Sequence, residues 1–162
     1  MKCSNQCCTI QTGLYHHVPY VHNPKHKYRR LKAGAFFYDT KTQRVLLVQS
    51  HGKKWGPPKG TIEEDCNETI QECAIREVKE ETGIQLDVHC LKKSYRVDRS
   101  TYYYVERDWD PMIRIPTGKD SYDVTGICWF KLPCLLQLYY QKKIDLNAQC
   151  KKLLKEILDI RI

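Results

Sequence analysis

A short acidic segment, Arg76 to Ile84, constrains the fold of this chain more than any other feature; its sequence is Arg-Glu-Val-Lys-Glu-Glu-Thr-Gly-Ile. At about 100° per residue in an α-helix, Glu77, Glu80 and Glu81 fall on one face, within an arc of roughly 100°. Like charges at this spacing destabilise a helix by a few tenths of a kcal/mol per pair. Mg²⁺ prefers carboxylate oxygens and commonly bridges to substrate phosphates, so a bound cation would reverse that cost. The segment therefore predicts metal-assisted phosphate chemistry, and a solvated helix face is the alternative.

Glycine, proline and asparagine residues predict where regular structure stops around this segment. Residues 55–60, Trp-Gly-Pro-Pro-Lys-Gly, predict an irregular loop whose backbone comes close to whatever it faces. Asn67 is a favourable N-cap residue, so we expect the helix to begin near it. Gly83 stands where a left-handed C-terminal cap is expected, and it should end the helix.

Loop and helix together resemble the Nudix box, Gly-x5-Glu-x7-Arg-Glu-U-x-Glu-Glu-x-Gly-U, in which U is a bulky aliphatic residue. From Glu68 onward the spacing fits at every fixed position of the pattern. Between Gly60 and Glu68 the chain has seven residues where the pattern has five, which lengthens that loop by two. The resemblance covers roughly residues 30–140. It implies an α/β fold, an α/β/α sandwich around a mixed β-sheet, here as a single hydrolase domain over residues 28–162.

The resemblance also implies roles for the residues of the box. Glu77, Glu80 and Glu81 would hold one or more Mg²⁺ or Mn²⁺ ions against a diphosphate, and one of them would act as base. Arg76 would orient a glutamate through a charge-assisted hydrogen bond, and the Gly60 carbonyl would supply a further metal ligand.

Two further site residues are expected outside the box helix. Lys59 would stabilise charge on the phosphates, with a solvated loop lysine as the alternative. Related branches carry an additional glutamate six residues before a tryptophan, and here Asp123 stands six residues before Trp129. Asp120 and Glu106 are reserve candidates for this additional metal ligand.

Hydrophobic periodicity predicts strands and helices that interleave along the rest of the chain. Strands are predicted at 33–38, 44–49, 85–96, 101–106 and 126–130, with turns at 39–42 and near residue 98. Helices are predicted at 132–140 and over the apolar stripe from Leu146 to Leu158. Residues 107–122 predict a long loop of the kind that often serves function. Residues 1–27 lack periodicity and predict a loosely ordered N-terminal arm.

The net charge of +8 contrasts with the acidic helix and points to a large anionic ligand. Solubility alone is the equally weighted alternative. The basic surplus lies in two groups: Lys25, Lys27, Arg29, Arg30 and Lys32, and Lys142, Lys143, Lys151, Lys152 and Lys155. We expect substrate contacts from Lys25, Tyr28, Arg29, Arg30 and Lys59, and RNA contacts from the basic arm and the C-terminal helix.

Two Nudix branches resemble the chain closely enough to suggest a substrate. Residues 45–49, 58–60, 73–78, 129–130 and 132–134 resemble the catalytic domain of mRNA-decapping enzymes, whereas Trp55 and residues 57–60 resemble diadenosine-tetraphosphate hydrolases. A nucleotide or capped RNA is therefore the expected substrate, with decapping favoured. Dinucleoside polyphosphates, diphosphoinositol polyphosphates and a noncatalytic nucleotide- or RNA-binding role are the alternatives. A cap base would need an aromatic partner, for which Tyr28, Tyr102, Tyr103 and Tyr104 are candidates.

Cysteine usage bears on compartment and on a second metal site. Nine cysteines, an odd number, indicate reduced thiols and a cytoplasmic location. No apolar run approaches the roughly 20 residues of a membrane span, so no membrane association is expected. Cys3, Cys7 or Cys8, His22 and His26 have spacings close to a Cys₂His₂ zinc pattern, although a disordered Cys/His-rich arm is the favoured alternative.

Overall fold

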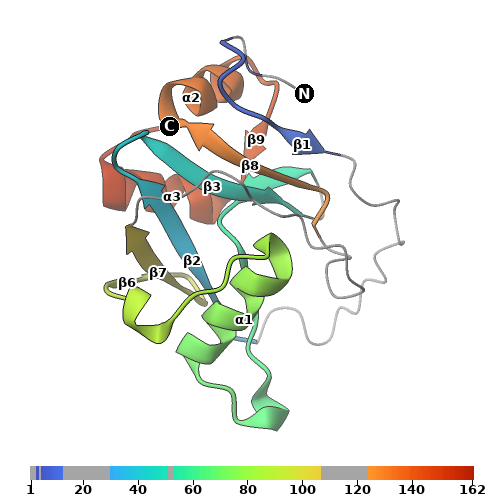
Figure 1. Cartoon of the computed structure of the whole chain (residues 1–162), viewed down its shortest axis with the longest axis vertical. Coiled ribbons are helices and arrows are strands. Elements are labelled where there is room, and N and C mark those ends of the chain that lie inside the picture. The colour runs from blue at the N-terminus through green and yellow to red at the C-terminus, as the bar shows by residue number, and fades with distance from the viewer. Residues whose placement is uncertain (1–2, 4, 13–29, 51–52, 107–123) are drawn as a thin grey trace.

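A mixed β-sheet forms the middle layer of the molecule (Figure 1). The computed structural model of the chain describes residue 3 and residues 5–12, 30–50, 53–106 and 124–162. The central strands run in the order β1-β8-β3-β2-β7-β6, while β5 pairs with β2 and β4 pairs with β3 and β9. The pairs β2–β7 and β4–β9 are parallel and the other pairs are antiparallel. The strands are β1 Gln11–Thr12, β2 Lys32–Asp39, β3 Arg44–Gln49, β4 Lys54–Gly56, β5 Lys59–Thr61, β6 Ser94–Val97, β7 Ser100–Glu106, β8 Gly126–Lys131 and β9 Asp145–Leu146.

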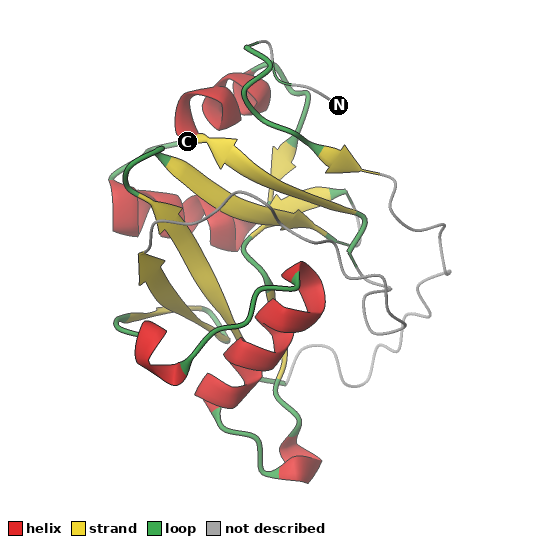
Figure 2. Cartoon of the chain, in the orientation of Figure 1, coloured by secondary structure: helices red, strands yellow, loops and turns green. Residues whose placement is uncertain are grey.

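Helices cover both faces of this sheet (Figure 2). Successive side chains of a strand point to opposite faces, so the neighbours Phe36 and Phe37 of β2 enter different core clusters. Phe36 packs in the cluster that contains Leu135 and Leu153, whereas Phe37 packs in the cluster that contains Val78. The α/β/α sandwich is therefore confirmed. Its helices are α1 Ile70–Thr82, α2 Leu132–Tyr140 and α3 Ala148–Leu158, with 3₁₀ turns η1 Glu64–Cys66 and η2 Val88–Cys90.

Helix α1 ends as predicted but begins later than predicted. Gly83 adopts the left-handed conformation (φ 72°) and its N–H donates to the Lys79 carbonyl, which confirms the C-terminal cap. Asn67 is wrong as the N-cap, because it closes the turn η1 in a left-handed conformation (φ 54°). Thr69 caps α1 instead, and Thr69 and Glu72 form a reciprocal capping box that satisfies two otherwise unpaired N–H groups.

Most predicted elements are confirmed, and two are wrong. The strand at 44–49 and the helix at 132–140 have the predicted bounds. β2 is one residue longer than predicted at each end, and β7 and β8 are each one residue longer at one end. The predicted strand at 85–96 is mostly irregular; only β6 belongs to the sheet. In its first part the Asp87 carboxylate accepts from the His89 N–H (2.8 Å) and nucleates η2, while Leu86 and Leu91 are buried. The predicted loop at 55–60 contains parts of β4 and β5, because Pro57 and Pro58 interrupt only the two residues between those strands.

The first residues of the predicted arm pack onto the domain. Cys3, Cys8 and Ile10 are buried, and β1 adds a strand to β8 with Gln11 opposite Ile127. Residues 13–27 lie outside the described residues, and the division of the chain at residue 27 stays a prediction. Among the helices that the structure describes, none has the length and apolar character needed to traverse a lipid bilayer.

Candidate functional site

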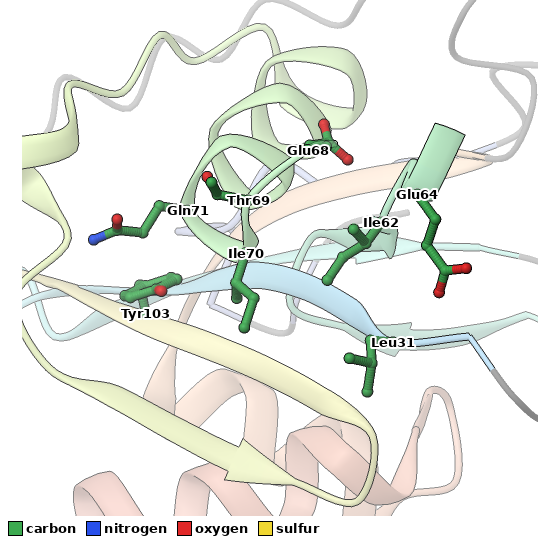
Figure 3. Close-up of a pocket in the computed structure, with 8 residues that line it drawn as sticks. All are labelled: Leu31, Ile62, Glu64, Glu68, Thr69, Ile70, Gln71 and Tyr103. Atoms are coloured by element: carbon green, nitrogen blue, oxygen red, sulfur yellow. The ribbon is translucent and has the colours of Figure 1, made fainter. Parts of the chain in front are cut away.

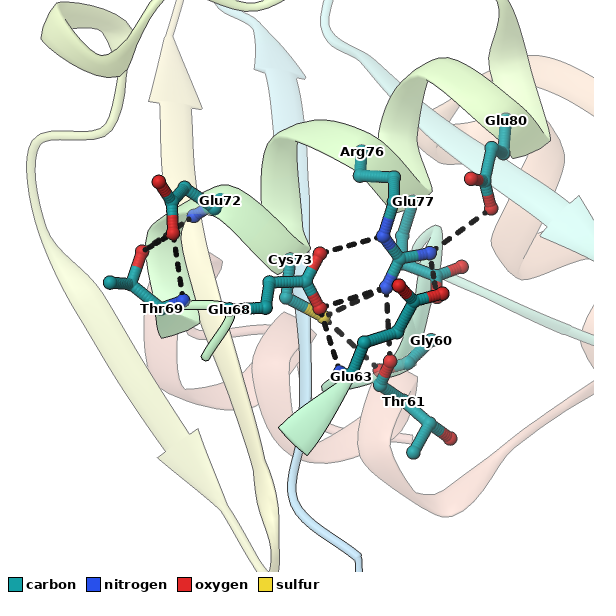
Figure 4. A network of polar contacts seen from close by, with 10 residues as sticks. All are labelled: Gly60, Thr61, Glu63, Glu68, Thr69, Glu72, Cys73, Arg76, Glu77 and Glu80. Atoms are coloured by element: carbon teal, nitrogen blue, oxygen red, sulfur yellow. Dashed lines mark hydrogen bonds and ion pairs between the residues drawn. The ribbon is translucent and has the colours of Figure 1, made fainter. Parts of the chain in front are cut away.

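Helix α1 carries the acidic residues on a side that adjoins its buried face and lies against β5. Cys73, Ala74 and Val78 are fully buried against the sheet. The glutamates occupy the adjacent face beside β5, as Figure 4 shows for Glu77 and Glu80. The helix therefore holds Glu77, Glu80 and Glu81 in fixed positions next to β5.

Arg76 joins the acids into one network (Figure 4). Its guanidinium donates from Nε to Glu68 Oε1 (2.6 Å) and from Nη2 to Glu68 Oε2 (3.0 Å). Nη1 donates to Glu77 Oε1 (2.8 Å) and to Glu80 Oε2 (3.2 Å), and Nη2 also donates to the Thr61 carbonyl (3.0 Å). The bonds from Arg76 hold the pKa of the Glu68 carboxyl below its usual value. Arg76 therefore places Glu77 and Glu80 side by side and ties them to the lengthened loop through Glu68.

Glu77 lies directly against the backbone of Gly60. A Cβ atom at Gly60 would overlap the Glu77 carboxylate, so only glycine permits this approach. Gly60 is held in β5 opposite Ala33 of β2. The turn η1 forms between β5 and α1 and accommodates the two extra residues of the loop. Gly60 therefore remains beside the helix.

The Gly60→Ala variant should disturb the site through steric overlap alone. We expect activity to fall by about tenfold or more, since the Glu77 carboxylate must move, and overpacking typically costs about 1–3 kcal/mol of stability. Steady-state kinetics and urea unfolding measure the two effects. Thr61→Ala on the next position of β5 is the control, because it retains the backbone carbonyl that Arg76 uses. Unchanged kinetics in Gly60→Ala would contradict the close approach.

Lys59 contributes its backbone and its amine at the other end of the cluster. Its N–H donates to Glu81 Oε2 (2.8 Å), which fixes the third glutamate. Burial lowers the pKa of the Lys59 amine, and the negative charge of Glu81 opposes this shift. A half-buried amine beside carboxylates can contact phosphate oxygens at short range.

The donor set fits a hard divalent cation. Glu77 and Glu80 share one guanidinium nitrogen, Glu81 is fixed by β5, and the Gly60 backbone adjoins Glu77. All of these groups offer oxygen atoms, which Mg²⁺ and Mn²⁺ prefer as ligands. When bound, the ion would neutralise charge on phosphoryl oxygens and activate water.

Metal affinity should depend on pH through Glu77. Burial raises the pKa of Glu77, and Arg76 opposes the shift. Because the pKa of Glu77 is higher in the folded protein than in the unfolded chain, protonation of Glu77 stabilises the metal-free folded protein at low pH. This contribution is complete below the unfolded-state pKa and is lost as the pH rises through the folded-state pKa. The cation binds the ionised form and displaces the proton, so Mn²⁺ affinity should weaken as the pH falls through the raised pKa of Glu77. Electron paramagnetic resonance titrations from neutral pH down to about pH 4, the ordinary range of a glutamate, measure this, and an affinity that stays constant throughout would contradict it.

Several predicted contacts fall outside the described residues or away from the cluster. Lys25, Tyr28, Arg29, Asp120 and Asp123 belong to ranges that the structure does not describe. Arg30 is described and exposed just before β2. Glu106 pairs with Tyr38 of β2, and Lys59 pairs with Gly34, four residues earlier on the same strand. The backbone of Glu106 therefore lies about 13 Å along the sheet from that of Lys59, away from the carboxylate cluster.

The tyrosines of β7 divide between the two faces. Tyr102 is fully buried and donates to Gln149 Oε1 (3.1 Å), so it cannot stack on a base. Tyr104 packs against the core cluster on the side of α2 and α3. Tyr103 faces the other side and lines a hollow of about 520 Å³ at the start of α1 (Figure 3). The periodicity of β7 predicted a strand but could not show which tyrosine borders this hollow.

The C-terminal lysines lie across the sheet from the acidic helix. Helix α3 packs in the core cluster of Phe36, opposite the face that α1 covers. Lys152 forms an ion pair with Asp98 (2.9 Å), and Lys151 donates to the Tyr139 hydroxyl (2.9 Å). A ligand on α1 would have to pass around the sheet to reach α3.

Comparisons with known proteins agree with this architecture. A model of the NUDIX domain matches residues 28–149. The chain is 32% identical over 142 residues to "Putative hydrolase 111R" of Invertebrate iridescent virus 3, covering 84% of this chain and 79% of that protein. It is 39% identical over 75 residues to the m7GpppN-mRNA hydrolase dcap-2 of Caenorhabditis elegans, covering 41% of this chain and only 9% of that protein.

A solved structure shares the fold at lower identity. The C. elegans Ap4A hydrolase binary complex superposes with a TM-score of 0.53 at 20% identity, over 79% of this chain and 96% of that one. The family match covers most of the chain, and Arg76, Glu77 and Glu80 of the box lie together on α1 next to Gly60 of β5. The chain therefore belongs to the Nudix family, and it is a hydrolase of pyrophosphate bonds.

Proposed function

We propose that this Nudix hydrolase cleaves a pyrophosphate linkage of the mRNA 5′ cap, or of a related nucleotide-containing diphosphate, with Mg²⁺ or Mn²⁺ bound at α1. The observation that carries the chemistry is the carboxylate cluster that Arg76 and β5 hold together. The net charge of +8 and the likeness to dcap-2 support capped RNA as the substrate. The nine free thiols support the expected reducing, cytoplasmic compartment.

We propose a separate role for each residue of the site. Glu77, Glu80 and Glu81 would hold the ion, and one of them would accept a proton from the attacking water. The Lys59 amine would contact the phosphates. Arg76 would keep the acids in place without touching the substrate.

The hollow beside α1 supports recognition of a base. Tyr103 offers an aromatic face there, and Leu31 and Ile70 are both exposed hydrophobic side chains on its wall (Figure 3). Glu68 lines the hollow and also binds Arg76, which places the hollow next to the cluster. We propose that Tyr103 stacks on a base of the substrate.

Tyr103→Ala should raise KM for a capped substrate by about tenfold with a smaller effect on kcat, because stacking contributes roughly 1–3 kcal/mol per base. Tyr140→Ala is the matched control, since Tyr140 is 64% exposed on α2, outside the hollow. Equal KM values for the two variants would remove Tyr103 from base recognition.

A dinucleoside polyphosphate is the second candidate substrate, and the likeness of Trp55 and residues 57–60 to diadenosine-tetraphosphate hydrolases favours it. A panel of capped RNA, diadenosine tetraphosphate and a diphosphoinositol polyphosphate, with products identified by mass spectrometry, separates these substrates. For capped RNA we expect the largest kcat/KM and a steep loss as salt rises, since phosphate contacts release counterions. Much faster turnover of diadenosine tetraphosphate, with little salt dependence, would replace the decapping proposal.

A noncatalytic nucleotide- or RNA-binding role is disfavoured because Glu80 and Glu81, which such a module would be expected to lose, are both present. Binding of capped RNA without turnover of any member of the panel would support that role.

A further inference from the structure

Four cysteine side chains meet where the N-terminal residues contact α2. The sulfur atoms of Cys3, Cys7, Cys8 and Cys134 all lie within 4.8 Å of one another. Cys3, Cys8 and Cys134 are buried and Cys7 is half-buried. In Figure 1 this region of β1 and α2 lies at the end of the molecule opposite to α1. The cluster is therefore separate from the carboxylate site.

The spacing of the sulfurs suits a tetrahedral metal. A Zn–S bond of about 2.3 Å gives sulfur–sulfur separations of about 3.8 Å in an ideal tetrahedron. The observed Sγ–Sγ distances are 3.6 Å for Cys3–Cys7, 3.8 Å for Cys7–Cys8 and 3.2 Å for Cys7–Cys134. Small side-chain movements would complete the tetrahedron.

Polar groups around the cluster are placed to support thiolates. The Cys8 N–H donates to Cys3 Sγ (3.3 Å), and the Lys131 N–H donates to Cys8 Sγ (3.3 Å). Arg44 Nη1 lies 3.9 Å from Cys8 Sγ and provides positive charge beside it. Such N–H donors and a nearby cation stabilise the negative charge of a thiolate-bound metal.

Arg44 also fixes the backbone around the sulfurs. Its Nη2 donates to the Cys7 carbonyl (2.6 Å) and its Nη1 to the Trp129 carbonyl (2.9 Å). One side chain therefore connects β3, β8 and the N-terminal segment at the cluster. The ligands would be held before a metal arrives.

We propose that Cys3, Cys7, Cys8 and Cys134 bind one Zn²⁺ in a closed structural site. The four thiols lose their protons to solvent on binding, and no position remains for water or substrate. This ligand set differs from the predicted Cys₂His₂ pattern, because Cys134 supplies a sulfur from a distant part of the chain. His22 and His26 lie outside the described residues. The metal would fasten the N-terminal segment, and with it β1, to α2 and β8.

Metal analysis of the purified chain tests the proposal. The untagged protein is prepared with a thiol reductant and without chelator, washed with excess Mg²⁺, and analysed by inductively coupled plasma mass spectrometry. We expect one equivalent of zinc in the wild type and in Glu81→Gln, since the carboxylate site is not involved. Substitution with Co²⁺ should give the visible absorption bands of tetrahedral thiolate coordination. Wild-type protein without zinc, or with iron instead, would overturn the proposal.

Single variants then identify the ligands. Cys134→Ser and Cys3→Ser should lose most of the zinc and lower Tm, whereas Cys66→Ser, at an exposed cysteine outside the cluster, should keep both. If Cys134→Ser does not fold, the zinc content and the cobalt spectrum of the wild-type protein still test whether the zinc site exists. Full zinc retention in Cys134→Ser, or a Cys7–Cys134 disulfide found by peptide mass spectrometry in freshly prepared protein, would contradict the site. Pyrophosphate hydrolysis by the same samples tests the proposed function separately.

Discussion

Replacing Glu81 by Gln lowers the rate of pyrophosphate-bond hydrolysis by about 10²–10³-fold at saturating Mg²⁺, because a metal ion contributes several kcal/mol to stabilising the reacting phosphates. The amide keeps the shape of the side chain and can still accept the Lys59 N–H, which bonds Glu81 Oε2 at 2.8 Å in the native protein. The change therefore removes one negative charge with little effect on packing. Steady-state rates across a Mg²⁺ titration measure the loss, and the apparent affinity for Mg²⁺ should also fall.

The matched control is Glu156→Gln. Glu156 is an exposed glutamate of α3, in the layer on the opposite side of the sheet, so the same change in net charge occurs away from the site. It should retain the wild-type rate. A Glu81→Gln enzyme that is as fast as the control would defeat the assignment of the site.

Replacing Arg76 by Met has the second largest expected effect, on stability as well as rate. The guanidinium makes five hydrogen bonds to oxygen atoms, of Glu68, Glu77, Glu80 and the Thr61 carbonyl. Removing it leaves three neighbouring acids without their common partner. Breaking a buried ion pair costs about 3–5 kcal/mol, and since the Arg76 side chain is 25% exposed we expect about 2–4 kcal/mol from urea unfolding without metal. Activity should fall with it, because Glu77 and Glu80 lose their fixed geometry.

Arg76→Lys separates charge from geometry. Lysine restores the positive charge but cannot donate to both oxygens of Glu68 while also binding Glu77 and Glu80, so only part of the stability should return. Saturating Mg²⁺ should reduce the stability deficit of Arg76→Met, since a cation at the glutamates replaces part of the lost positive charge.

A double-mutant cycle with Glu68→Gln tests whether Arg76 acts through Glu68. We expect a coupling energy of about 0.5–3 kcal/mol, as is usual for residues in one hydrogen-bond network. Additive free energies of unfolding would show that the two side chains act independently.

The elements that could be predicted from the sequence are those with strong local signals. The apolar run of β3 and the glycine at the end of α1 specify their conformations within a few residues, and both are confirmed. The predicted start of α1 is wrong because Asn67 is a favourable cap in isolation, whereas Thr69 and Glu72 form reciprocal hydrogen bonds across the first turn of the helix. Local preference alone does not decide between competing caps.

Contacts between distant segments could not be predicted. The addition of β1 to β8 depends on the burial of Cys3, Cys8 and Ile10, which have no periodic pattern in the sequence. The approach of Cys134 to the N-terminal cysteines also depends on how α2 packs. Such placements follow from the three-dimensional arrangement of the sheet and its helices.

In the candidate site, too, some features follow from the local sequence and others depend on how distant segments pack. The three glutamates follow from helical spacing, since residues on one turn share a face whatever the rest of the chain does. The hydrogen bond from the Lys59 N–H to Glu81 and the overlap that Gly60 avoids depend on where β5 meets α1. The hollow at Tyr103 depends on which face of the sheet the Tyr103 side chain points to. The alternation of residues along β7 does not decide this until the strands and helices that pack against β7 are known.

Hydrolysis of capped RNA and diadenosine tetraphosphate after complete chelation, followed by stepwise return of Mg²⁺ or Mn²⁺, tests most directly whether α1 works through a bound cation. We expect no cleavage in the chelated protein and full recovery with either ion, at a higher concentration for Glu81→Gln than for the wild type. Cleavage of a phosphoric anhydride bond at the wild-type rate without any divalent ion would contradict the account.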